Sequence, residues 1–184
     1  MENKKNPTLS MQLTPVGVVR SEIKTPMISA DQADLTPEQR MEKVKAYHRR
    51  VEDTVCELVI EARWAELLDG IDAFSHILVL YWPHLLDPAR RELKKVHPMG
   101  RKDMPLQGIF ATCSPARPNP VLVSAVPLVA RKGNLLEVRG LEAIDGSPII
   151  DLKPYSQNYL QIDNRAANNP AHDQAKRSRS HRHF

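Results

Sequence analysis

A proline-rich stretch between two apolar segments carries the side chains whose types and spacing best suit chemistry. Residues 108–121 hold one guanidinium, one carboxamide and two hydroxyls, on Arg117, Asn119, Thr112 and Ser114. Three prolines in the second half of the stretch exclude a helix and a central strand, so the loop is rigid. Polar groups on a rigid loop that is anchored at both ends favour a binding site over a linker. The alternative is an ordinary proline-rich turn.

Three other motifs accompany this stretch along the chain. They cover residues 16–21, 71–80 and 140–155, and together with residues 108–120 they span most of the sequence. Their residues and their order resemble the TsaA-like (YaeB) family, the S-adenosylmethionine-dependent methyltransferases that act on N6-threonylcarbamoyladenosine in tRNA. The resemblance implies S-adenosylmethionine as the cofactor, tRNA as a partner, a β-barrel fold, and a homodimer with its cofactor sites near the subunit interface.

The resemblance also implies which residues surround the cofactor. They come from five places in the chain: Pro15, Val16 and Gly17; His84 and Leu85; Cys113; Val123; and Gly140, Leu141 and Glu142. A carboxylate such as that of Glu142 suits the ribose hydroxyls or the ammonium group of the donor. The family usually has arginine at the position of Cys113 and aspartate at the position of Glu142.

Methyl transfer from a sulfonium donor is an in-line displacement without a metal, so the protein must orient the reactants and exclude water. An exocyclic adenine nitrogen is a poor nucleophile, and acceptors aimed at its N–H groups would direct its lone pair toward the methyl. We expect Asn119 and Asp145 to supply such acceptors and Tyr155 to stack on the base. Arg117 or Lys153 would pair with the threonyl carboxylate. The alternative is that Asn119 and Asp145 are turn residues and that Tyr155 belongs to the core.

Other chemistries have less support in the sequence. Cys113 suggests a nucleophile of the kind used in pyrimidine methylation, but no activating neighbour accompanies it, which favours an inert cysteine. The histidines at positions 76, 84 and 97 lack the spacing of metal ligands, so we expect no metal. Two further functions stay open: the same barrel acting on a small molecule or another substrate, and a non-catalytic module that binds the cofactor or RNA.

The composition is that of one soluble domain with a tail. The chain has 184 residues, of which 41% are hydrophobic and 26% charged. No secretory signal opens it, and no apolar run approaches the roughly 20 residues of a membrane span. We therefore expect a cytoplasmic protein without membrane contact. Cys56 and Cys113 give no disulfide framework.

The net charge of +4 arises in the last nine residues, which contain Lys176, Arg177, Arg179 and Arg182. The remainder of the chain balances 22 basic against 22 acidic residues. A basic tail attracts phosphate backbones, and an ordinary solvated chain end is the alternative. We expect residues 1–155 to form one domain and residues 156–184 to form a flexible, polar tail.

The residue patterns of the domain predict about seven strands and one helix. The strands are expected at residues 14–20, 57–61, 73–82, 109–112, 121–130, 135–141 and 148–152. Turn signals between them indicate a closed antiparallel barrel or a sandwich, and the resemblance selects the barrel. A helical insertion is expected at residues 36–55, capped by Thr36 together with Gln39. Residues 84–105 should form a long, partly basic loop.

Overall fold

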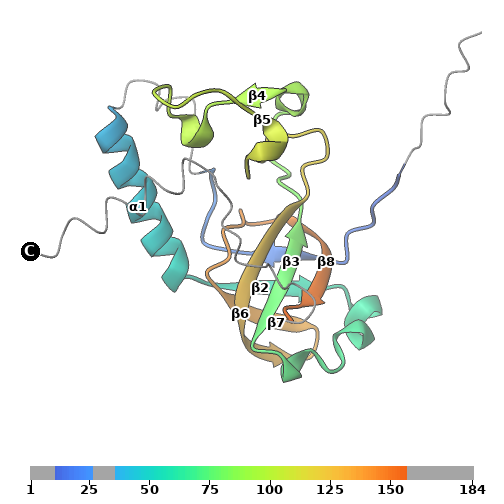
Figure 1. The fold of residues 1–184 in the computed structure, drawn as a ribbon. Coiled ribbons are helices and arrows are strands. Elements are labelled where there is room, and N and C mark those ends of the chain that lie inside the picture. Colours follow the sequence, from blue (N-terminus) through green and yellow to red (C-terminus); the bar gives the residue numbers. More distant parts are fainter. Residues whose placement is uncertain (1–10, 27–35, 157–184) are drawn as a thin grey trace, which may run out of the picture.

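The structure, a computed structural model of the chain, describes residues 11–26 and 36–156. Strands of this part close into an antiparallel barrel in the order β1-β2-β7-β6-β3-β8 (Figure 1). The barrel strands are β1 (Gly17–Arg20), β2 (Val55–Ile60), β3 (His76–Tyr81), β6 (Leu122–Lys132), β7 (Leu135–Arg139) and β8 (Pro148–Pro154). The predicted mainly β fold and its barrel are therefore confirmed. The predicted tail lies outside the described residues, apart from its first position.

The inside of the barrel is the hydrophobic core. In β2 and β3 the fully buried side chains alternate with partly exposed ones, as the period of two in a strand requires. Leu58, Ile77, Val79 and Leu136 have no exposed surface and belong to one cluster. Because apolar side chains fill the interior, binding groups must lie at the ends of the barrel or on the elements outside it.

The predicted helical insertion is the helix α1 (Pro37–Asp53), which leads directly into β2. Its capping box is present, because the Thr36 hydroxyl accepts from the Gln39 amide at 3.3 Å and the Gln39 side chain accepts from the Thr36 amide at 3.0 Å. Val44 and Val51 are buried, whereas most other described side chains of the helix are exposed. The helix ends before residue 55, because Val55 already pairs with Arg139 of β7. No helix in the described part of the chain is long and apolar enough to cross a membrane.

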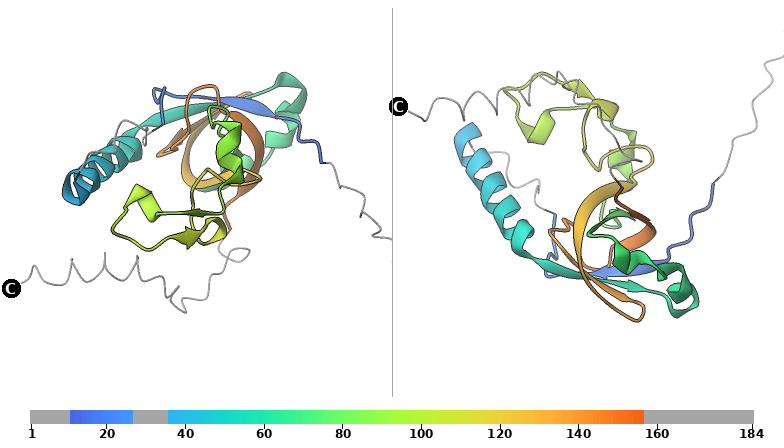
Figure 2. Two further views of the ribbon diagram at one scale, coloured as in Figure 1. Left: turned by 90° about the horizontal axis from the view of Figure 1, so that it is seen from above. Right: turned by 60° about the horizontal axis from the view of Figure 1, so that its bottom comes forward.

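A second layer, which we call the lobe and define as residues 84–121, lies beyond one end of the barrel (Figure 1). It contains η4 (Pro88–Glu92), β4 (Lys95–Val96), η5 (Pro98–Gly100), β5 (Gln107–Gly108) and η6 (Ile109–Ala111), and β4 and β5 pair in a small sheet of their own. Residues 84–105 are thus more structured than the predicted loop. Seen from above, α1 and the lobe lie side by side on one side of the barrel (Figure 2).

The prediction of a strand at residues 109–112 is wrong, and hydrogen bonds explain why. After the Ile109 amide has bonded to the Lys94 carbonyl, the Ile109 carbonyl accepts from the amide and the hydroxyl of Thr112. These bonds close one turn of a 3-10 helix in place of a ladder. Two further 3-10 helices, η2 (Ala62–Leu68) and η3 (Ile71–Ala73), connect β2 to β3.

Candidate functional site

The segment that follows β7 is held tightly from two sides. Gly140 has a φ of 77°, a conformation that favours glycine, and its amide donates to the Thr54 carbonyl at 2.9 Å. Leu141 is completely buried in the core. The Tyr81 hydroxyl at the end of β3 donates to the Glu142 carbonyl at 2.9 Å. These predicted cofactor residues therefore form one rigid turn between the end of α1 and the end of β3.

The Glu142 carboxylate lies against the helix. It accepts a hydrogen bond from the Tyr47 side chain, and His48 is close enough to act on it electrostatically. Partial burial raises the pKa of Glu142, while His48 and the Tyr47 hydrogen bond oppose that rise. Burial, with the nearby Glu142 charge second, raises the pKa of Tyr47 to about 12. Glu142 still keeps an exposed surface, so its carboxylate is partly desolvated and remains accessible to a ligand.

Sequence reasoning did not single out Tyr47 and His48. Their signal was available in the spacing of α1, because Val44, His48 and Val51 recur at intervals of three and four residues and so mark one face of the helix. What the spacing does not show is that this face meets Glu142, which lies 95 positions after Tyr47.

His84 lies beside the turn that precedes β8. Its Nδ1 is 3.4 Å from the Oγ of Ser147, which is buried, and a Cβ on Gly146 would lie 3.7 Å from its Nε2. The other predicted cofactor residues near this end present apolar or thiol surface to solvent: Leu85 is 55% and Val123 58% exposed, and Cys113 is exposed. Val123 is next to Ser124, whose hydroxyl is 3.5 Å from that of Tyr81. Polar and apolar groups therefore meet around the Tyr81 end of β3.

The predicted cofactor residues Pro15, Val16 and Gly17 lie elsewhere. Gly17 pairs with Ile60 at the far end of β2, whereas Gly140 bonds to the residue just before β2 begins. The six residues of β2 separate the two segments by roughly 20 Å at about 3.3 Å per residue. Within one chain, residues 15–17 and 140–142 therefore do not meet.

Residue 16 belongs to a different hollow. Val16 lines a pocket of about 380 Å³ between η2, η3 and the end of β8. Most of its wall is apolar, formed by Val16, Ile60, Trp64, Leu67, Leu68, Ile71, Phe74, Leu152 and Pro154. Gly17 has a packing reason for being glycine, because a Cβ would lie 2.3 Å from the Val59 carbonyl oxygen.

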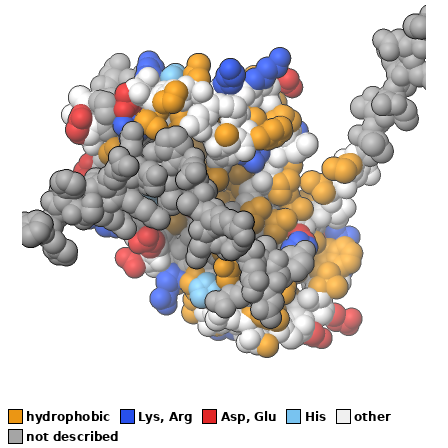
Figure 3. Space-filling model, viewed as in Figure 1, with side chains coloured by type: hydrophobic (Ala, Val, Ile, Leu, Met, Phe, Trp, Pro, Cys, Tyr) orange, Lys and Arg blue, Asp and Glu red, His pale blue; other side chains and the backbone are white. Residues whose placement is uncertain are grey.

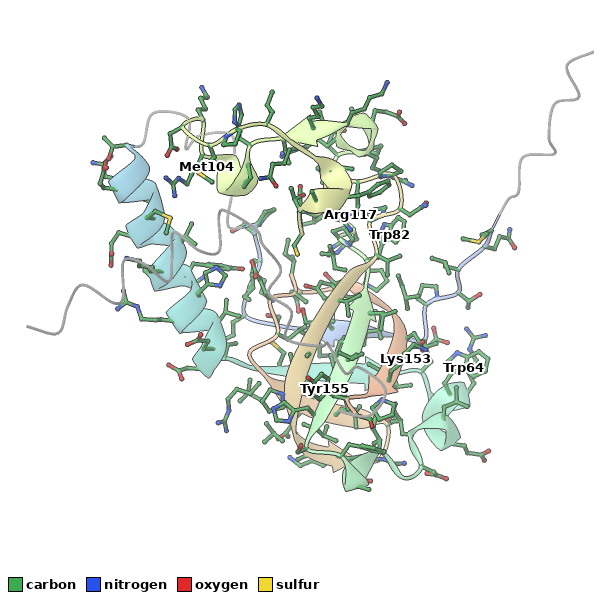
Figure 4. The ribbon with its side chains drawn as sticks, in the orientation of Figure 1. Trp64, Trp82, Met104, Arg117, Lys153 and Tyr155 are labelled. Carbon is green, nitrogen blue, oxygen red and sulfur yellow. The ribbon has the colours of Figure 1, made fainter. Side chains whose placement is uncertain are left out.

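The Arg117 guanidinium holds together the proline-rich stretch of residues 108–121, which we call the signature loop. It donates to the Ser114 carbonyl at 2.9 Å and to the carbonyls of Ile109 and Thr112. Asn119 is exposed two residues later. Arg91 of η4 donates to the Pro118 carbonyl at 2.9 Å and lies over the Trp82 ring at 5.4 Å. Figure 4 shows Arg117 and Trp82 close together where the lobe meets the barrel. Arg117 and Arg91 therefore brace the loop through its carbonyls.

Asp145 braces the turn before β8. One carboxylate oxygen accepts from the Ser21 amide at 2.9 Å and the other pairs with Lys24 at 2.8 Å. Lys24 first, and then the Ser21 amide, hold the pKa of Asp145 below its usual range. This is the contact pattern of a structural carboxylate, which the sequence left open as an alternative. The catalytic assignment of Asp145 stays a prediction.

Lys153 and Tyr155 lie near the other end of β8, away from Arg117 (Figure 4). Lys153 pairs with Asp151 at 2.7 Å, and its side chain is 48% exposed. The Tyr155 amide donates to the His76 carbonyl, and the Tyr155 ring, 40% exposed, lies 6.3 Å from the His76 ring. The acceptor candidates thus lie in three places: on the loop, at the turn before β8 and at the far end of β8.

No group of three or more His, Cys, Asp or Glu residues is arranged to hold a metal in residues 11–26 and 36–156. Cys56 and Cys113 are both free thiols, the first buried and the second exposed. Burial raises the pKa of Cys56, so that thiol is protonated and unreactive near neutral pH.

Comparisons with known proteins find similar sequences and similar folds. The family model of the tRNA-methyltransferase O N-terminal domain matches residues 27–161. A probable S-adenosyl-L-methionine-binding protein of Methanothermobacter thermautotrophicus is 39% identical over 150 residues, 82% of this chain and 93% of that protein. An S-adenosyl-L-methionine-binding protein of Archaeoglobus fulgidus is 40% identical over 146 residues, 79% of this chain and 90% of that protein.

More distant matches extend the comparison. A mouse tRNA (adenine(37)-N6)-methyltransferase is 31% identical over 105 residues, 57% of this chain and 24% of that protein. The crystal structure of TrmO from Pseudomonas aeruginosa, 19% identical, superposes with a TM-score of 0.61 over 93% of this chain and 75% of that one. The superposition shows that the two proteins share a fold.

Proposed function

Because this chain belongs to the family of the tRNA-methyltransferase O N-terminal domain, we propose that it methylates the exocyclic nitrogen of N6-threonylcarbamoyladenosine beside the anticodon of tRNA. The family match over residues 27–161 carries this proposal. The cofactor is S-adenosylmethionine, after which relatives at 39% and 40% identity are named. The tRNA substrate has the support of the mouse relative's name. Such a substrate would place the protein in the cytoplasm.

The residues around Glu142 fit half of such a cofactor. A partly desolvated carboxylate, fixed through its backbone by Tyr81 and through its side chain by Tyr47, suits ribose hydroxyls or an ammonium group. The exposed apolar side chains of Leu85 and Val123 suit a flat heterocycle. S-adenosylmethionine supplies a methyl group on a sulfonium sulfur, and the task of these residues is to orient it and to exclude water.

We propose that a second copy of the chain completes the cofactor site. The segment at residues 15–17 lies roughly 20 Å from Glu142 along β2 at about 3.3 Å per residue. If both segments contact one cofactor, they must come from different subunits. A homodimer with the cofactor at its interface meets that requirement, and the apolar pocket beside Val16 is a surface that such a partner would cover.

On the acceptor side, the loop and the end of β8 have different roles in the proposal. Asn119 is exposed beside a rigid loop, so its carboxamide oxygen is placed to accept from the N–H of the base. Tyr155 has an exposed ring face for stacking. Lys153 or Arg117 would pair with the threonyl carboxylate, and each already has partners within the chain: Lys153 pairs with Asp151, and the Arg117 guanidinium donates to three loop carbonyls.

The direct test uses purified full-length protein with S-adenosylmethionine and tRNA that carries or lacks the threonylcarbamoyl group. Mass spectrometry of the digested tRNA should show a methyl group on the modified nucleoside and very little on plain adenosine. Calorimetry on the same sample establishes that the cofactor binds. If the cofactor binds but neither tRNA is methylated, the substrate assignment is wrong and methylation of a small molecule becomes the better explanation. If the cofactor does not bind to folded protein, the protein is not acting as a methyltransferase.

A further inference from the structure

The lobe carries cations that have no partner in the described part of the protein. Arg90, Lys94, Lys95 and Lys102 are exposed, and none of their side chains makes a hydrogen bond or ion pair with another described residue. Each would keep a hydration shell and counterions in solution. In Figure 3, Lys and Arg side chains line the top edge of the molecule, where Figure 1 places the lobe.

The acids of the lobe do not cancel this charge. Residues 84–121 contain seven basic and three acidic side chains, which is a net charge of +4. Asp87 accepts from the Ala89 amide at 2.9 Å, and Asp103 is bound to Arg101. Among the lobe's acids this leaves Glu92 beside the cations. The lobe is therefore a positively charged part of a domain whose remaining residues, up to residue 155, contain 14 basic and 17 acidic side chains.

An aromatic ring is exposed on the same lobe. Phe110 is 82% exposed, whereas its neighbour Ile109 is 5% exposed and belongs inside the lobe. The Ile109 amide donates to the Lys94 carbonyl at 3.0 Å, and Gly108 pairs with Lys95. The backbone that carries Phe110 therefore lies close to the backbone of Lys94 and Lys95. An isolated phenylalanine with this exposure contributes little to the core, which leaves its ring face for a partner.

We infer that a face made of Arg90, Lys94, Lys95, Lys102 and Phe110 binds a single-stranded segment of RNA. The cations would contact phosphates, and the Phe110 ring would stack on one unpaired base. Stacking needs a base that is free of a partner, so the face should prefer single strands over duplex. We call it the basic-aromatic face. This inference rests on the proposed function, and it adds a surface by which the substrate is held.

The position of the face suits that role. Arg91, in the same η4 turn as Arg90, donates to the Pro118 carbonyl and lies over Trp82, which ties the lobe to the signature loop. An RNA strand held on the lobe is therefore fixed relative to Asn119. The surface also supplies phosphate contacts independently of the basic chain end at residues 176–182.

The test measures RNA binding by full-length protein with a fluorescein-labelled oligoadenylate across a range of salt concentrations. The double variant Lys94→Ala/Lys95→Ala should bind more weakly, and its salt slope should fall by about 1.4, because each phosphate contact on a single strand contributes about 0.7. Phe110→Ala should weaken binding by about tenfold with little change in slope. Phe110→Trp should restore it. A fully paired duplex should lose less affinity than the oligoadenylate does when Phe110 is replaced by alanine.

The matched control is Arg63→Ala/Lys132→Ala, which removes the same number of charges from η2 and from the β6–β7 hairpin, away from the lobe. Binding by the lobe variants that equals binding by this control overturns the inference. So does a Phe110→Ala variant that dissociates a dimer but binds RNA normally, because the ring would then cover a second copy. If tRNA is methylated while the lobe variants bind RNA normally, the inference about the basic-aromatic face is wrong and the proposed function stands. If RNA binding depends on the face but no tRNA is methylated, the inference about the face is correct and the proposed methyl acceptor is wrong.

Discussion

The Tyr81 hydroxyl donates a hydrogen bond of 2.9 Å to the backbone carbonyl of Glu142, a residue 61 positions further along the chain. Tyr81 is 5% exposed and ends β3, whereas Glu142 follows β7. The bond joins β3 to the segment that follows β7, and these two strands are not neighbours in the sheet order. It therefore fixes the backbone of the segment that presents the Glu142 carboxylate.

Replacement of Tyr81 by phenylalanine should loosen this segment. The change leaves the ring in place but removes the donor, so the stability of the protein should fall by about 1–3 kcal/mol. Because Glu142 then loses a fixed backbone position, the affinity for S-adenosylmethionine should fall as well. Urea denaturation and calorimetry measure the two effects. Full cofactor affinity in a destabilised Tyr81→Phe variant would show that the cofactor does not depend on this segment.

Tyr47→Phe should change the pH dependence of cofactor binding. The Tyr47 hydrogen bond lowers the pKa of Glu142, although burial keeps that pKa above its ordinary value of 4.5. Without the hydroxyl the pKa should rise further, so acidification should protonate Glu142, and weaken cofactor binding, at a higher pH than in the unchanged protein. Tyr47 itself does not titrate in this range, since its pKa is about 12.

Calorimetry repeated at several pH values follows that midpoint, and Glu142→Gln is its control because it removes the titrating group. The effect on stability has the opposite sign to the effect on cofactor binding. A carboxyl whose pKa is raised by folding stabilises the fold below its unfolded pKa, and the contribution is lost as the pH rises through the folded value. Glu142→Gln should therefore flatten the stability curve just above pH 4.5. An unshifted binding midpoint in Tyr47→Phe would rule out the contact as a determinant of Glu142.

The barrel was predictable because alternating and apolar runs are local signals. The buried strand at residues 76–81 and the helix cap at Thr36 are each contained in a few neighbouring residues. The strand expected at residues 109–112 failed for the opposite reason. Its side chains favour a strand, but Thr112 donates a hydrogen bond to the Ile109 carbonyl. The Arg117 guanidinium, which lies later in the chain, donates to the same carbonyl.

The sequence predicts which residues are candidates for the site, but not which of them lie close together in space. Motifs identify Gly17 and Gly140 as special, but the register of β2 decides that they lie at opposite ends of a strand. The contact of Tyr47 with Glu142 likewise depends on how α1 is oriented relative to the segment that follows β7. Such relationships are long-range packing outcomes that a residue's own neighbours in the sequence do not determine.

Gly17→Ala should disrupt the barrel, whereas Gly108→Ala should not. A Cβ at position 17 would lie 2.3 Å from the Val59 carbonyl oxygen, so β1 and β2 must separate to admit it. We expect a loss of about 1–3 kcal/mol of stability or a failure to fold. Position 108 has nothing within 4 Å of the added methyl group and is the matched control. Thermal denaturation compares the two, and equal stabilities would contradict the close approach of β1 and β2.

Arg117 and Lys153 are the two cations proposed for the threonyl carboxylate, and substitutions can distinguish them. The Arg117 fork donates to the carbonyls of Ile109, Thr112 and Ser114, so its main effect should be on the shape of the loop. Arg117→Lys keeps the positive charge but loses the planar set of N–H donors that reaches several carbonyls. We expect it to lower turnover on modified and unmodified tRNA by the same factor, and Arg117→Met should do the same.

Lys153→Met should instead act on discrimination. If Lys153 pairs with the carboxylate, removing its charge should reduce the preference for the modified nucleoside by about tenfold or more, the size of one charge-assisted hydrogen bond. Turnover on plain adenosine should change little, because that base has no carboxylate to lose. The measurement is the ratio of kcat/KM on the two tRNAs for each variant. A ratio that collapses in Arg117→Met but survives in both Arg117→Lys and Lys153→Met would assign the carboxylate to Arg117, and the loop would then hold substrate and shape with the same side chain.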